Sequence, residues 1–121
     1  MYKKAEIDKI DKYIEIMLNI LKEIINPKKI MIFGSYVYGK PNEDSDLDLL
    51  IVIDKDEIPK NYDEKLEIKA EIRKLIRDIN KKIAIDLIVF TVPEYQEFIN
   101  SNSSFSREIL EKGKILYEKA S

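Results

Sequence analysis

Three short apolar runs, separated by segments of helical character, constrain the fold of this chain more than any other feature. They span residues 29–33, 47–53 and 84–91 and have the length and residue types of β-strands. The run 47–53 is apolar at all but one position, as expected of a strand that is buried on both faces. We expect strands at these three places, with an edge strand over 115–117.

Amphipathic segments flank these runs. Between residues 4 and 25, apolar side chains recur every three or four positions, which places them on one face of a helix. In the next helical segment, the expected core residues are Leu66, Ala70, Leu75, Ile76 and Ile79. The expected helices span 4–25, 64–81, a stretch opened by Pro93, and 105–112. This order predicts a single domain over 1–121 of the α/β (α+β) class, with a small mixed sheet of three to four strands flanked by helices.

Composition excludes several kinds of chemistry. The 121 residues include no cysteine and no histidine, which rules out disulfides, thiol catalysis and a histidine base. A net charge of −2 and a pI near 5.3 argue against direct nucleic-acid binding. The apolar runs are far too short to span a membrane, and no secretory signal opens the sequence. We therefore expect a cytoplasmic protein with no membrane partner.

One stretch combines the residues that chemistry needs. Gly34 and Ser35 directly follow the first expected strand, and the segment 34–44 indicates a loop leading into a short helix. Glycine lets a ligand approach the backbone closely, and a serine hydroxyl can donate to a phosphate oxygen. Asp46 and Asp48 open the second strand, where residues two apart point to the same side.

A third carboxylate, Asp86, lies inside the third apolar run. If the second and third strands are neighbours, three carboxylates meet, and such like charges require a cation. Oxygen ligands suit Mg²⁺. Taken singly, each feature has a structural explanation: Gly-Ser is a common turn, Asp-x-Asp occurs by chance, and a core aspartate can be satisfied locally. Their combination in this order favours a site.

This pattern resembles the nucleotidyltransferase superfamily of the DNA polymerase β type, and more narrowly the minimal nucleotidyltransferases (MNT, MntA-like). The resemblance is clearest over residues 28–92. It implies a polymerase β-like fold in which Gly34 and Ser35 contact the nucleotide phosphates. It also implies that Asp46, Asp48 and Asp86 are metal ligands and catalytic residues, with Asp86 placed to help deprotonate the acceptor. One departure is visible, because many relatives have Ala-Arg-Gly where this chain has Val37-Tyr38-Gly39. Whether the absent arginine weakens catalysis, or whether Lys40 replaces it, stays open.

The resemblance further implies a reaction. It predicts transfer of AMP from ATP to a hydroxyl, with two Mg²⁺ ions and release of pyrophosphate. The acceptor it implies is a tyrosine of a small helical HEPN-type toxin. The chain would then be the antitoxin of the pair, and it could form a hetero-oligomer with the toxin. We expect no separate acceptor domain in a chain of this length. Two alternatives stay open: an antitoxin that blocks its toxin by binding alone, and a stand-alone transferase acting on a small molecule or an RNA end.

Overall fold

The computed structural model describes residues 4–38 and 46–120. Within this part of the chain, no helix is long and apolar enough to cross a membrane. The elements follow one another as α1 (Lys4–Ile24), β1 (Lys29–Phe33), α2 (Ser35–Tyr38), β2 (Leu47–Val52), α3 (Tyr62–Leu75), α4 (Arg77–Asn80), β3 (Ile85–Phe90), α5 (Val92–Asn100), α6 (Ser104–Lys112) and β4 (Lys114–Glu118).

The four strands form one mixed sheet in the order β3-β2-β1-β4. β1 is antiparallel to both β2 and β4, whereas β2 and β3 are parallel. The parallel pair requires a crossover connection, which α3 and α4 provide. All four strands lie where the apolar runs predict them, and the expected edge strand is β4. The predicted mixed α/β class is therefore confirmed.

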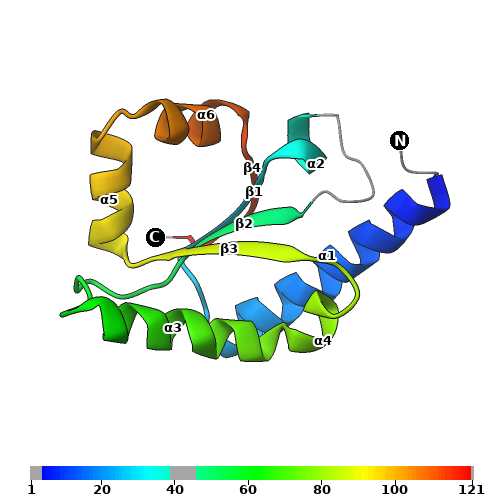
Figure 1. Cartoon of the computed structure of the whole chain (residues 1–121), viewed down its shortest axis with the longest axis horizontal. Coiled ribbons are helices and arrows are strands. Elements are labelled where there is room, and N and C mark those ends of the chain that lie inside the picture. The colour runs from blue at the N-terminus through cyan, green and yellow to red at the C-terminus, as the bar shows by residue number, and fades with distance from the viewer. Residues whose placement is uncertain (1–3, 39–45, 121) are drawn as a thin grey trace.

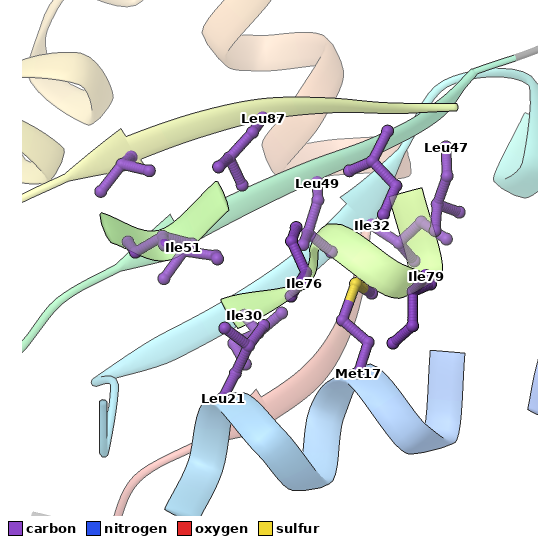
Figure 2. Close-up of a cluster of buried hydrophobic side chains, with 13 residues drawn as sticks. Met17, Leu21, Ile30, Ile32, Leu47, Leu49, Ile51, Ile76, Ile79 and Leu87 are labelled. Atoms are coloured by element: carbon purple, nitrogen blue, oxygen red, sulfur yellow. The ribbon is translucent and has the colours of Figure 1, made fainter. Parts of the chain in front are cut away.

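Helices cover both faces of the sheet (Figure 1). α1, α3 and α4 lie on one face, and Figure 2 shows Met17 and Leu21 of α1 pointing into the core between that helix and the sheet. Leu47, Leu49 and Ile51 of β2 contribute to this core with no exposed side-chain surface. The buried members of this cluster are Met17, Leu21, Ile30, Ile32, Leu47, Leu49, Ile51, Ile72, Ile76, Ile79, Ile85, Leu87 and Val89.

α5 and α6 cover the opposite face. Because side chains alternate along a strand, the residues of β2 between those just named point to this second layer. Its buried members are Met31, Phe33, Leu50, Val52, Tyr95 and Ile109. Burial on both faces explains why β1 and β2 are almost continuously apolar.

The crossover segment departs from the prediction in two ways. The helix expected over 64–81 is two helices, because Ile76 leaves the helical conformation with φ −106° and ψ 15°. Leu66 and Ala70 are exposed instead of belonging to the core. At about 100° per residue, Leu66 lies roughly 120° around the helix from the buried Ile72, and Ala70 still farther. Ile76 and Ile79, also expected in the core, are buried there together with Ile72. The core prediction for this segment is therefore confirmed for these two residues and wrong for Leu66 and Ala70.

The α2 region also differs from expectation. Residues 34–44 were expected to form a loop before a short helix, but α2 begins at Ser35, immediately after Gly34. Residues 39–45, which include Gly39 and Lys40, lie outside the described residues.

Two leucine-to-alanine substitutions test the assignment of core and surface. Leu49→Ala is expected to lower the free energy of unfolding by about 2–5 kcal/mol, because it leaves a cavity in a closed core. Leu66→Ala removes the same atoms from an exposed position and should change stability by about 0.5 kcal/mol or less. Urea denaturation followed by circular dichroism measures both. Equal losses for the two variants would contradict the assigned helix face.

Candidate active site

The five site residues predicted from the sequence gather at one end of the sheet. Gly34 follows the last residue of β1, and Asp46 precedes the first residue of β2. Because β1 and β2 are antiparallel, the end of one meets the start of the other. β3 runs parallel to β2 and brings Asp86 to the same end. The second and third strands are therefore neighbours, as the meeting of the three carboxylates requires.

The strand register brings the carboxylates together. Asp48 is the partner of Asp86 across the parallel pair and of Phe33 across the antiparallel pair. Asp48 shares its side of β2 with Leu50 and Val52, which pack under α5 and α6. Asp48 itself is half-buried, and Asp46 and Asp86 are exposed. The three carboxylates therefore lie at the end of the sheet, beyond the part of it that α5 and α6 cover.

Gly34 makes room for Asp48. Its backbone has φ +83°, a left-handed conformation that residues with a side chain rarely adopt. A Cβ atom built on Gly34 would overlap Oδ2 of Asp48. The sequence had suggested a glycine that lets a ligand approach, whereas here the near neighbour is a side chain of the site itself. A glycine directly after a strand was the only signal for this contact.

The electrostatics of Asp48 reflect its neighbours. Burial raises the pKa of Asp48 first of all, and the negative charges of Asp86 and Asp46 raise the pKa further. A carboxylate with a raised pKa is destabilised in its charged form. A cation placed among these oxygens would relieve that repulsion.

The donor chemistry of these residues fits Mg²⁺, since each side chain offers carboxylate oxygen. In residues 4–38 and 46–120, however, no group of three acidic side chains is arranged to hold a metal ion as it stands. Asp48 and Asp86 are neighbours in register, whereas Asp46 lies outside the strand and is exposed. The metal-binding role of the three residues therefore stays a prediction.

Ser35 opens α2 beside these carboxylates. It is half-buried, and the turn it belongs to is closed by the backbone N–H of Val37, which donates to the carbonyl of Gly34 at 3.0 Å. Tyr36 and Val37 pack against the core between the sheet and α1. This packing ties the Gly34–Ser35 turn to the body of the domain. Contact of the turn with phosphates remains a prediction.

Comparisons with known proteins identify relatives of this chain. Residues 15–121 match the family model described as polymerase beta, nucleotidyltransferase. A Methanocaldococcus jannaschii protein, MJ0604, provisionally named a protein adenylyltransferase, is 33% identical over 92 residues, covering 74% of this chain and 78% of its own.

Two solved structures share the fold. One, provisionally named a nucleotidyltransferase, comes from Sulfolobus solfataricus. It superposes with a TM-score of 0.56 and 18% identity over 98% of this chain and 91% of its own. The other is a toxin–antitoxin with AMP-PNP, with a TM-score of 0.51 and 18% identity over 85% of this chain and 71% of that one.

Substituting Gly34 tests the close approach to Asp48. Gly34→Ala should lower the free energy of unfolding by about 1–2 kcal/mol because of the left-handed backbone alone. The loss should be larger than that because the Asp48 side chain must also move. In an Asp48→Ala background the nearest remaining atom of that side chain is Cβ, at 3.3 Å. The cost of Gly34→Ala should therefore be smaller there. A double-mutant cycle in urea measures the difference, and strictly additive effects would show that the two residues do not interact.

The raised pKa of Asp48 predicts a pH-dependent gain in stability. Asp48 holds its proton more tightly in the folded than in the unfolded chain. At neutral pH, where the carboxyl is ionised, its charge therefore destabilises the folded state. Asp48→Asn should therefore raise the melting temperature at neutral pH. The gain should fade toward about pH 3, where the carboxyl is protonated in both states.

Asp54→Asn is the matched control, because it should change the melting temperature in the opposite direction. Lys119 hydrogen-bonds to Asp54 at 2.8 Å and lowers the pKa of that carboxyl, so Asp54→Asn should lower the melting temperature at neutral pH. A stability gain from Asp48→Asn that is the same at every pH would show that it does not come from relieved charge.

Proposed function

Because the chain belongs to the polymerase beta nucleotidyltransferase family, we propose that it transfers AMP from ATP to a hydroxyl of a partner protein. The observation that carries this proposal is the register of β2 and β3, which pairs Asp48 with Asp86 beside Gly34. A relative that shares a third of its residues over most of both chains bears the name of a protein adenylyltransferase. That name supports a protein as the acceptor.

The proposed reaction forms one bond and breaks one. The acceptor oxygen attacks the α-phosphorus of ATP, and the bond from that phosphorus to the oxygen bridging toward the β-phosphorus breaks. Pyrophosphate leaves with the electron pair of the broken bond. The acceptor proton passes to a carboxylate, and we assign that role to Asp86, which is exposed on the edge strand.

The remaining site residues bind and orient. We assign contact with the phosphates of ATP to Gly34 and Ser35, which follow β1. Asp46, Asp48 and Asp86 would hold two Mg²⁺ ions, which when bound supply neutralisation of the triphosphate and of the charge that develops on the leaving group. No histidine base is needed, because carboxylates hold the ions and accept the proton. This fits a sequence without histidine.

We assign the acceptor to a tyrosine of a small helical HEPN-type toxin, which makes the chain the antitoxin of a pair. One of the structures with this fold is a toxin–antitoxin with AMP-PNP, which supports both a toxin partner and an adenine nucleotide as donor. A neighbouring gene for a small helical protein with an Arg-x4-6-His motif would identify the partner.

A labelling experiment tests this function. The chain, Mg²⁺ and ATP labelled at the α-phosphate are incubated with the co-encoded protein, with RNA and with small hydroxyl compounds. Label is expected on the co-encoded protein, and mass spectrometry should place one or more AMP units on a tyrosine. Asp46→Asn, Asp48→Asn and Asp86→Asn should each reduce labelling by roughly 100-fold or more.

Asp54→Asn serves as the control. Asp54 follows β2 at the end of the sheet away from the carboxylates, and its substitution should leave labelling unchanged. Label on RNA or small molecules alone would refute a protein acceptor. Full neutralisation of the toxin in cells by the Asp46→Asn and Asp48→Asn variants would instead show that binding, without catalysis, suffices.

A further inference from the structure

Four phenylalanine rings form a row across the face of the sheet that carries the carboxylates. The ring centroids of Phe90 and Phe98 are 5.2 Å apart, those of Phe98 and Phe105 are 5.9 Å apart, and those of Phe105 and Phe33 are 5.9 Å apart. Phe33 ends the row as the strand partner of Asp48. The row therefore extends from the buried cluster under α5 and α6 to the strand partner of Asp48.

Phe105 differs from the other members in its exposure. Phe33 is buried and Phe90 and Phe98 are half-buried, but Phe105 keeps 46% of its surface exposed. A single exposed apolar side chain is ordinary. This ring, however, makes edge-to-face contacts with both Phe98 and Phe33 at interplanar angles of 77°. It is thus an accessible aromatic surface held in place by its neighbours.

The position of the carboxylates limits where a bound nucleotide can lie. The opposite face of β2 is closed, because Leu47, Leu49 and Ile51 are completely buried there. Asp48 points instead to the α5/α6 side of the sheet, as does its strand partner Phe33, and the ring of Phe105 contacts Phe33 with 5.9 Å between the centroids. A nucleotide with its phosphates near Gly34 and Asp48 can extend its ribose and base over this aromatic surface.

We propose that the exposed ring of Phe105 stacks on the base of the donor nucleotide. This inference rests on the proposed function, since it needs a nucleotide whose phosphates lie at Gly34 and Ser35. Bases stack on aromatic side chains through their π-faces, and such contacts contribute substantially to binding. Phenylalanine has no hydrogen-bonding group, so Phe105 contributes affinity for the ring rather than recognition of its edge.

A tryptophan reporter tests this contact directly. The chain contains no tryptophan, so Phe105→Trp introduces a single fluorophore at the proposed stacking position. ATP with Mg²⁺ should quench its fluorescence, and inorganic triphosphate, which has no base, should not. Leu110→Trp is the matched control, because Leu110 is also exposed on α6 but is not in the row. Its fluorescence should not respond to ATP.

Calorimetry then measures the contribution of the ring. Phe105→Ala should weaken ATP binding on the order of tenfold and leave triphosphate binding unchanged, whereas Phe105→Tyr should retain the affinity. Equal ATP affinity of wild type and Phe105→Ala would overturn the stacking role, as would an equal loss for ATP and triphosphate. If the wild-type chain binds neither ATP nor triphosphate, the proposed function itself fails, which is a different result.

Discussion

The parallel pairing of β2 with β3 determines both the position of the carboxylates and the covering of the sheet. It sets Asp48 beside Asp86, and it requires the α3–α4 crossover that closes one face of the sheet. A slip by one residue would turn every side chain of β2 to the other face. Asp48 would then enter the closed core, and Leu49 would take its place at the site. Burial of Leu47, Leu49 and Ile51 therefore fixes the register that the carboxylates need.

The charges of the domain are arranged in two opposite ways. Away from the site, acidic and basic side chains pair, as Lys65 does with Glu94 at 2.9 Å and Lys119 with Asp54 at 2.8 Å. At the site, carboxylates face one another, and the pKa of Asp48 is raised. The fold thus tolerates a local repulsion that a bound cation would relieve. Such a trade of stability for function is common in enzyme sites.

Much of this fold could be predicted from the sequence, because its strands coincide with apolar runs bounded by polar segments. The site residues could also be selected, since Gly34, Ser35 and the three aspartates follow recognisable spacing. Their contacts could not. The overlap that a side chain at Gly34 would make with Asp48 depends on how two strand ends meet, which is tertiary information.

The errors have related physical causes. Helical periodicity marks an apolar face, but between residues 64 and 81 more than one face was compatible with the sequence. Ile76 and Ile79, which the sequence placed in the core, are buried there with Ile72. Leu66 and Ala70, predicted with them, are left exposed by packing against the sheet. Ile76, where the helix is interrupted, is itself buried in this cluster. The role of Phe33 beside Asp48 was missed because no local signal distinguishes it from other core residues.

The place of β4 in the sheet has a consequence for how the molecule is made. β4 pairs with β1, the first strand of the chain, and Lys119 N–H donates to the carbonyl of Lys28 at 2.9 Å. The second core likewise needs Tyr95 and Ile109 to cover Met31 and Phe33. On the ribosome, every site residue from Gly34 to Asp86 is therefore synthesised before the layer that supports Phe33 exists. Long-range pairing of this kind forms slowly, so a nascent chain carries all five site residues well before it can hold them in place.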